Sequence, residues 1–200
     1  MKRCLPLIIA ALLTACAATP PVTETAPAAP PVAWKYTYMQ SYEAKQAGLG
    51  VSYRYESTIG WTDAYVYTMR RTNWAAGVAD AQFQAHFRSI IEAVEESARR
   101  GVYTDLKVGA TRDLVISGQN FRSVSFQYKV NGRLVDSLAY LTALDGQLLK
   151  YRMSFYAPVP GDVDAIARQF IETNLREGMP RAVVHVPAAD RPWVTNAEAR

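Results

Sequence analysis

The sequence predicts an α+β fold, a single domain in which an antiparallel sheet of about six strands packs against two helices in the order ββ-α-ββββ-α. Three observations predict this class. Two segments have apolar residues at helical spacing, several segments alternate apolar and polar residues with the two-residue period of a strand, and short glycine-containing turns join the later strands. Strands joined by such short turns are antiparallel, because parallel neighbours need long crossover connections.

The domain is expected to span residues 34–178, and two strands open it. Residues 34–42 are rich in tyrosine and predict either a strand or a short helix. After the turn at 48–50, residues 51–56 alternate apolar and polar side chains and predict a half-buried strand. Residues 62–70 are rich in β-forming residues and predict the second strand.

A helix is predicted after these strands, because apolar residues then recur at the spacing of one helical face. They are Phe83, Phe87, Ile90, Ile91, Val94 and Ala98. Asp80 stands where an N-cap residue belongs, and Gly101 where a C-terminal capping glycine belongs.

A meander of strands follows the helix. Residues 102–116 predict one or two strands, and the segment 124–130 alternates clearly. Asn131-Gly132 is a strong hairpin signal, because both residues tolerate the positive φ angles of a tight turn. Asp145-Gly146 is a second signal of the same kind, so three consecutive strands are predicted to be antiparallel neighbours.

A second helix is predicted between Asp162, its N-cap, and Gly178, where a glycine-then-proline stop begins. The order of elements over residues 46–177 resembles the Mog1/PsbP-like α+β sandwich. The resemblance is one of topology and not of motif. It implies an antiparallel sheet with helices packed on it, in a family that includes assembly factors and adaptor-like proteins and has no shared catalytic site.

The N-terminal segment has the order of a secretory signal: basic residues, a short apolar run and small residues. Leu13-Thr14-Ala15-Cys16 at its end resembles the lipobox of bacterial lipoproteins. This resemblance implies diacylglycerol on the Cys16 sulfur, cleavage between Ala15 and Cys16, and acylation of the new amino terminus. The alternative is an ordinary secretory signal cut near Ala18. Ala17 after the cysteine implies an outer-membrane anchor facing the periplasm, in preference to the inner membrane.

Three further segments complete the expected organisation. Residues 1–15 are the signal, and residues 16–33 are the lipidated cysteine with a Pro/Ala-rich linker. An extended linker of this composition reaches about 50 Å, at roughly 3.1 Å per residue; a Pro-rich docking peptide is the other interpretation. Residues 179–200 lack periodicity and predict a loosely ordered tail.

Charge and cysteine content limit the possible functions. The chain has 22 basic and 18 acidic residues, and removal of residues 1–15 takes Lys2 and Arg3 with it. The mature chain then has a net charge of only +2, which gives no argument for a nucleic-acid partner. Cys4 leaves with the signal and Cys16 is lipidated, so the domain has no thiol, disulfide or cysteine-based metal site.

No motif for a defined reaction is present. His86 and His185 stand alone, without the further ligands that a metal site needs, so we expect no metal and no cofactor. No nucleophile motif occurs either. The leading hypothesis is a non-catalytic, lipid-anchored envelope protein that binds or supports an envelope partner. The alternatives are an envelope hydrolase with dispersed carboxylates and a carrier of an apolar or anionic small ligand.

One group of basic residues is a candidate binding site. Lys129, Lys150 and Arg152 occupy the polar positions of predicted meander strands, and Arg122 and Arg133 could join their rim. If the strands are neighbours, the first three residues form a patch for an anionic partner. The alternative is the solvated face of an antiparallel sheet.

Overall fold

The computed structural model describes residues 32–71, 73–74 and 78–178. They form β1 (Lys35–Ser41), β2 (Val51–Ser57), β3 (Gly60–Tyr67), α1 (Ala81–Arg99), β4 (Thr104–Val108), β5 (Arg112–Ile116), β6 (Gln119–Val130), β7 (Arg133–Leu144), β8 (Gln147–Tyr156) and α2 (Val163–Glu177). The pairings between these strands are antiparallel. The prediction of a single α+β domain is confirmed.

The sheet has the strand order β1-β2-β3-β8-β7-β6-β4, and β5 also pairs with β6. β4 pairs with the end of β6 and β5 with its beginning, so two short strands share one edge of one long strand. The pairing of β3 with β8 joins the N-terminal hairpin to the C-terminal meander. Sequence-distant strands thereby become neighbours at the centre of the sheet.

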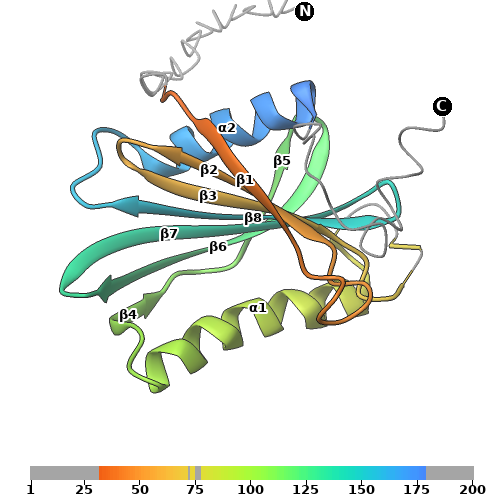
Figure 1. Ribbon diagram of the computed structural model, residues 1–200, viewed down its shortest axis with the longest axis horizontal. Helices are drawn as coiled ribbons and strands as arrows, with labels where there is room; N and C mark the ends of the chain where they lie inside the picture. Colours follow the sequence, from red (N-terminus) through yellow and green to blue (C-terminus); the bar gives the residue numbers. More distant parts are fainter. Residues whose placement is uncertain (1–31, 72, 75–77, 179–200) are drawn as a thin grey trace, which may run out of the picture.

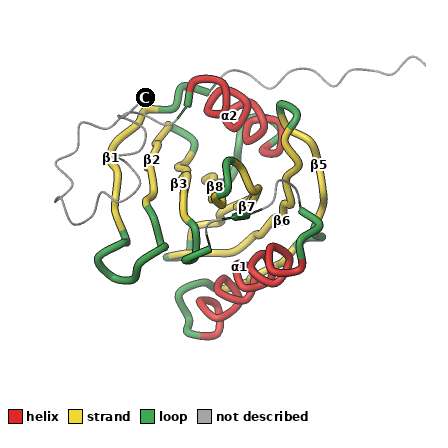
Figure 2. Tube along the Cα trace, turned by 90° about the vertical axis from the view of Figure 1, so that its right-hand side faces the viewer, coloured by secondary structure: helices red, strands yellow, loops and turns green. Residues whose placement is uncertain are grey.

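The two helices lie on opposite faces of the sheet (Figure 1, Figure 2). α2 packs its apolar face, including Ile166, Phe170 and Ile171, on a core that contains Tyr151 and Met153. α1 packs Phe83, Phe87 and Val94 on a second core that contains side chains from β6, β7 and β8. Side chains alternate along each strand, and the strands β3, β6, β7 and β8 contribute residues to both cores.

Capping side chains fix where both helices begin. The Asp80 carboxylate accepts a hydrogen bond from the Phe83 amide at 2.9 Å, and the Asp162 carboxylate accepts one from the Asp164 amide at 2.9 Å. These bonds satisfy amide groups that have no partner inside the helix. Both predicted N-caps are therefore confirmed.

The hairpin turns also follow the prediction. Asn131 and Gly132 have φ angles of 51° and 76°, and Asp145 and Gly146 have 52° and 76°. Positive φ at both central residues is the geometry of the type I′ turn, whose twist matches that of the flanking strands.

The described residues form a sheet of eight strands and not about six, because the N-terminal segment is a strand and 102–116 contains two strands where a count of six assumes one. The strands that the prediction left open, β1, β4 and β5, each lie at an edge of the sheet, where side chains are more exposed and alternation is weaker. The predicted signal, Cys16, nearly all of the linker and the tail 179–200 lie outside the described residues. Among the helices that are described, none is long and apolar enough to cross a membrane.

Candidate binding site on the α1 side of the sheet

The structure brings together two of the three basic residues of the predicted patch. Lys150 and Arg152 are both on the face of β8 that points toward α1. Lys129 is on the opposite face of β6 and pairs with Asp105 at 2.7 Å. The reason is that helices cover both faces: the apolar side of β6 packs on α1, whereas the apolar side of β8 packs on α2. The polar sides of these strands are therefore different faces of the sheet.

Strand register places further charges beside Lys150 and Arg152. Arg54 on β2 is opposite Asp63 on β3, and Asp63 is opposite Arg152 on β8. Lys150 occupies the next row on the same face, opposite Tyr65. We call Arg54, Asp63, Lys150 and Arg152 the α1-side cluster.

Arg54 and Asp63 form the paired half of this cluster. The Arg54 Nη1 atom donates to Asp63 Oδ2 at 2.8 Å, and both side chains are largely withdrawn from solvent. Burial raises the pKa of the Asp63 carboxyl, and Arg54 opposes that shift. The Arg54 Nε atom is buried without a hydrogen-bond partner, 3.7 Å from Glu56 Oε1.

Arg152 lies across the neighbouring strand. Its guanidinium carbon is 4.6 Å from the centre of the Phe126 ring on β6, although β7 separates β8 from β6. Two strand spacings amount to roughly 10 Å, so the arginine and the phenylalanine meet above β7. Ala139 is directly opposite Arg152, and its small side chain leaves room for this path. The Arg152 Nη1 atom is buried and has no hydrogen-bond partner.

Lys150 rests on aromatic rings. Its Nζ atom is 4.1 Å from the centre of the Tyr65 ring and 5.6 Å from that of Tyr67. Burial, and then the charge of Arg152, lower the pKa of Lys150 to about 8, whereas Asp63 acts in the opposite direction. Lys150 is therefore mostly charged at neutral pH and loses its charge as the pH becomes mildly alkaline.

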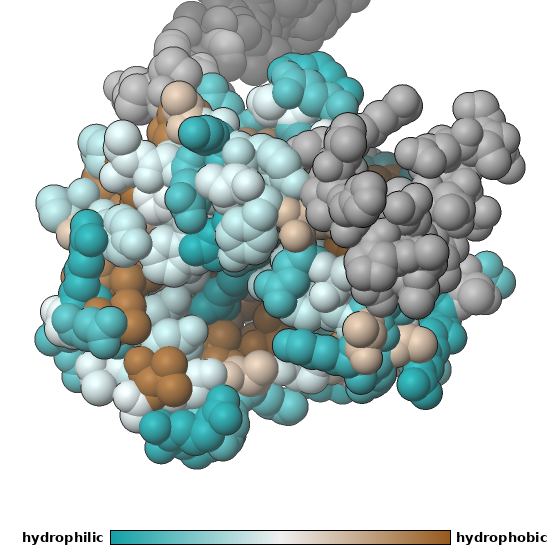
Figure 3. All heavy atoms as spheres, viewed as in Figure 1, coloured by the Kyte–Doolittle hydropathy of each residue, from teal (hydrophilic) through white to brown (hydrophobic). Residues whose placement is uncertain are grey.

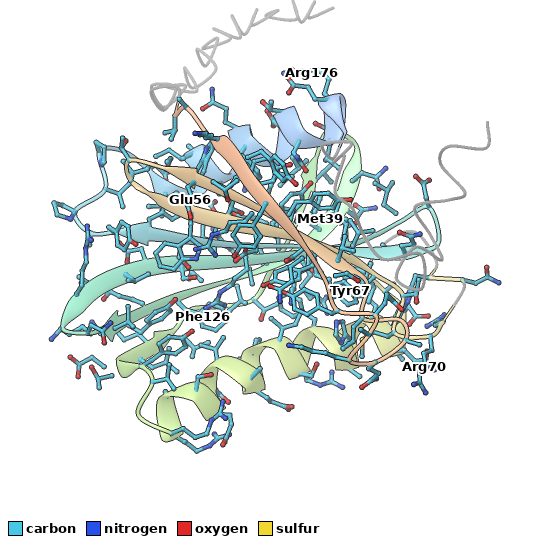
Figure 4. All side chains as sticks on the ribbon, viewed as in Figure 1. Met39, Glu56, Tyr67, Arg70, Phe126 and Arg176 are labelled. Atoms are coloured by element: carbon cyan, nitrogen blue, oxygen red, sulfur yellow. The ribbon has the colours of Figure 1, made fainter. Side chains whose placement is uncertain are left out.

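A buried tyrosine–histidine pair closes the site toward α1. The Tyr67 hydroxyl and His86 Nε2 are 2.7 Å apart, and the two rings meet edge to face. Burial, followed by the charge of Lys150, lowers the pKa of His86 to about 4. Neutral His86 is thus a packing and hydrogen-bonding residue. Tyr67 and Phe126 mark the two ends of the site along α1 (Figure 4).

Aromatic side chains form the outer rim. The Trp61 ring is 5.1 Å from that of Tyr156 and 5.2 Å from the Arg54 guanidinium carbon. The guanidinium carbon of exposed Arg133 is 3.6 Å from the centre of the Tyr156 ring, so Arg133, one of the two predicted rim residues, does lie at this rim. The space-filling view shows a hollow between the sheet and α1 where hydrophilic and hydrophobic side chains lie together (Figure 3).

Lys150 and Arg152 differ from the other half-buried basic residues. Six lysines and arginines of the described chain are neither exposed nor fully buried, and four of them have a carboxylate within 4 Å. The pairs are Arg54 with Asp63, Arg71 with Asp80, Arg122 with Asp113 and Arg168 with Asp164. Of these six half-buried residues of the described chain, only Lys150 and Arg152 lack a carboxylate within 4 Å. A half-buried charge without a partner costs folding free energy.

The half-buried carboxylates Asp63 and Asp164 already have partners. Asp63 is held by Arg54, and Asp164 on the other face accepts hydrogen bonds from Tyr140 and Arg112. Within the described ranges, no group of three histidines, cysteines or carboxylates could hold a metal ion. Guanidinium and ammonium groups beside aromatic rings attract anions and can cover an attached apolar body.

Another hollow of about 320 Å³ lies beside Gly48, Gly50 and Arg70. Its carboxylate, Glu43, accepts hydrogen bonds from the amides of Gly48 and Gly50 and so stabilises the loop between β1 and β2. This carboxylate already has partners, and the α1-side cluster remains the stronger candidate.

Sequence reasoning did not identify Arg54 and Asp63 as site residues. Both occupy polar positions of segments that were predicted to be strands. Only the β3–β8 pairing, which sequence patterns do not reveal, places them beside Arg152.

Comparisons with known proteins assign no function. No family model and no curated protein matches the chain. One similar solved structure is that of PA94 from Pseudomonas aeruginosa, described as a protein of unknown function with a suggested regulatory role. The two chains are 12% identical, with a TM-score of 0.36, and the match covers 78% of this chain and 88% of PA94.

Proposed function

We propose that the chain is a lipid-anchored protein of the bacterial cell envelope whose α+β domain binds a partner and catalyses no reaction. The signal would be cleaved between Ala15 and Cys16. Diacylglycerol on the Cys16 sulfur would hold the mature chain in the outer membrane, facing the periplasm. Two or more acyl chains give stable anchoring, whereas one does not.

One observation carries the binding proposal: Lys150 and Arg152 are half-buried cations without a carboxylate partner among the described residues. Such charges do not stabilise the folded state, because the free-energy cost of removing them from water is only partly offset by cation–π contacts of about 0.5–2 kcal/mol. Features that weaken the fold are expected where a protein interacts with something else.

The junction between linker and domain supports a partner away from the anchor. Trp34, just before β1, packs edge-on against Phe170 of α2 with ring centres 5.3 Å apart. The linker thus joins the domain on the α2 side, whereas the α1-side cluster is on the opposite face (Figure 1). The site would then be open to the periplasm when the linker is attached to the membrane.

Metabolic labelling with a fatty-acid probe tests the anchor. We expect label on the wild type and on Cys4→Ser, whose changed residue leaves with the signal, and none on Cys16→Ser. Cys16→Ser should be soluble in the periplasm or uncleaved. An unlabelled wild type, or a cleaved Cys16→Ser chain that stays in the membrane, overturns the anchor.

Crosslinking in living cells tests the binding role. A photo-crosslinking amino acid replaces Arg133 at the rim of the site, or Glu172 on the exposed side of α2 as the matched control. We expect a defined adduct from position 133 that Arg152→Met reduces and that position 172 does not give. Identical adducts from both positions, or none from position 133, contradict a binding role for this face.

A further inference from the structure

The half-buried charges of the α1-side cluster do not balance. Among the described strands, Arg54, Lys150 and Arg152 bring three positive charges to the same face as one half-buried carboxylate, Asp63; Glu56, whose carboxylate is 3.7 Å from Arg54, is exposed to solvent. A phosphate monoester carries about −1.5 to −2 charges at pH 7. It would therefore neutralise the excess, whereas a carboxylate would neutralise only half of it.

We propose that the α1-side cluster binds a phosphate-bearing organic molecule, with Arg152 donating hydrogen bonds to the phosphate and Lys150 supplying a second positive charge. This inference rests on the proposed binding function and specifies its ligand class.

Arg152 is the residue best placed to hold the phosphate. Its Nη1 atom is buried and donates to nothing, although Asp63 is directly opposite on β3. The guanidinium is instead placed over the Phe126 ring, 4.6 Å from its centre, and this contact leaves Nη1 without a hydrogen-bond partner. A planar guanidinium with free donors binds phosphate oxygens in pairs. The unpartnered Arg54 Nε provides a further donor on the same row of the sheet.

The aromatic rim fits an organic body attached to the phosphate. Trp61, Tyr65 and Tyr156 are half-buried on the same face, next to the charged residues. Binding is favourable where an apolar or aromatic group of the ligand covers the face of an aromatic ring. We therefore expect an organic phosphate to bind more tightly than inorganic phosphate.

Lys150 gives the site a specific pH dependence. Many charged or titratable groups face it: Arg152 on β8, Asp63, Tyr65 and Tyr67 on β3, Arg54 on β2, Arg122 on β6, Tyr42 after β1 and His86 on α1. Its charge is lost as the pH rises through about 8. The second ionisation of a phosphate monoester is near pH 6, so the ligand's charge stays constant above pH 7. Binding should therefore weaken between pH 7 and 9.5, because only the lysine changes charge.

The test is titration calorimetry of the purified full-length protein in detergent and low salt, with phenyl phosphate as the probe. We expect at least tenfold tighter binding of phenyl phosphate than of benzoate or inorganic phosphate. Loss of one charge-assisted hydrogen bond corresponds to roughly a tenfold loss of affinity or more. Arg152→Met should therefore weaken binding about tenfold, whereas Lys129→Met, a lysine on the opposite face, should change it less than about twofold.

Lys150→Arg separates charge from structure. The wild type should lose about tenfold in affinity from pH 7 to 9.5, and Lys150→Arg should keep its affinity, because a guanidinium stays charged throughout that range. A merely structural lysine would not produce this difference. Equal pH profiles for the two proteins overturn the role of Lys150.

The remaining outcomes distinguish ligand source and class. Glycerophosphoglycerol, the soluble headgroup of an anionic phospholipid, serves as a diester probe with one negative charge; weaker binding than that of phenyl phosphate supports a phosphate monoester, whereas binding at least as tight overturns the charge argument and assigns the site to lipid headgroups. Benzoate binding as tightly as phenyl phosphate, or no binding of any phosphate, overturns the inference. Fatty-acid labelling and crosslinking through position 133 do not depend on phosphate binding. They could still support the proposed function if this inference about the ligand were overturned.

Discussion

The two faces of the sheet differ in whether their buried polar groups have hydrogen-bond partners. On the α2 side, the Tyr151 hydroxyl donates to Asn174 Oδ1 at 2.7 Å, and Asn174 Nδ2 donates to the Tyr55 hydroxyl at 3.1 Å. Groups left unpartnered there are neutral hydroxyls, those of Tyr36 and Thr62.

On the α1 side, by contrast, the unpartnered atoms belong to the guanidinium groups of Arg54 and Arg152. Arg54 still has Asp63 as its ion-pair partner, whereas Arg152 has no carboxylate within 4 Å among the described residues, and an unpaired charge costs considerably more than an unpaired hydroxyl. The comparison indicates that the buried polar groups of the α2 side stabilise the domain, whereas the unpaired charge of Arg152 on the α1 side costs stability. Removing Arg152 and removing a packed or hydrogen-bonded residue of the α2 side should therefore have opposite effects on stability.

The largest expected effect is on the α2 side. Phe170 is 6% exposed, and its ring meets those of Trp34, Tyr55 and Tyr151. Phe170→Ala should lower the free energy of unfolding by about 3–5 kcal/mol, because it removes buried apolar surface and leaves a cavity. Urea unfolding measures the change, with Val115→Ala, at a side chain that is 60% exposed, as the control. A loss below that range would mean that the aromatic cluster around Phe170 contributes less to stability than its burial indicates.

The next effect concerns the hydrogen-bond network on the same side. Asn174→Ala leaves the buried hydroxyls of Tyr55 and Tyr151 without their partner, at a cost of about 2–3 kcal/mol. Adding Tyr55→Phe and Tyr151→Phe should recover part of this loss, since no hydroxyl then remains unpaired. If the two phenylalanines only add to the loss, the network is not what stabilises this face.

Acid should weaken the α1 side through His86. Its pKa is about 4 in the folded chain, against 6.5 for an unperturbed histidine, so between these values the unfolded chain binds a proton that the folded chain does not. Stability contributed by neutral His86 is complete above pH 6.5 and is lost as the pH falls toward 4. Chemical unfolding at pH 7 and 4.5 should show a loss of about 2 kcal/mol in the wild type that His86→Gln lacks. Equal losses in both proteins would exclude His86 as the cause.

The smallest effect has the opposite sign. Arg152→Met keeps the apolar contact with Phe126 and removes the buried unpartnered donor, so the free energy of unfolding should rise by about 1 kcal/mol. Lys129→Met, which breaks an exposed pair with Asp105, should change stability by less than about 0.5 kcal/mol. A destabilised Arg152→Met protein would show that this arginine is part of the fold's support, and the contrast between the faces would disappear.

Much of the fold could be predicted because its signals are local. The caps Asp80 and Asp162 and the turns at Asn131 and Asp145 act within a few residues, and the structure confirms all four. Edge strands carry weaker alternation, which is why β1, β4 and β5 were less clear. The resemblance to the Mog1/PsbP-like fold and the lipid anchor on Cys16 remain predictions.

The site was harder to predict because it depends on pairing between distant strands. Polar residues of β6 and β8 look alike in sequence, yet Lys129 and Arg152 face opposite helices. Arg54 and Asp63 join Arg152 only through the β3–β8 register. No periodicity within a segment contains that information, since a strand's apolar side can pack on either helix.

The small side chain of Ala139 sets a constraint on how this protein can vary. It is fully buried directly opposite Arg152, on the strand that the arginine crosses. A leucine or phenylalanine at 139 would occupy the arginine's path and displace its guanidinium from Phe126. Relatives that keep arginine at 152 should therefore keep alanine, glycine or serine at 139, and the two positions should covary. That pair would be a sequence marker for a working site in chains too divergent to recognise by overall similarity.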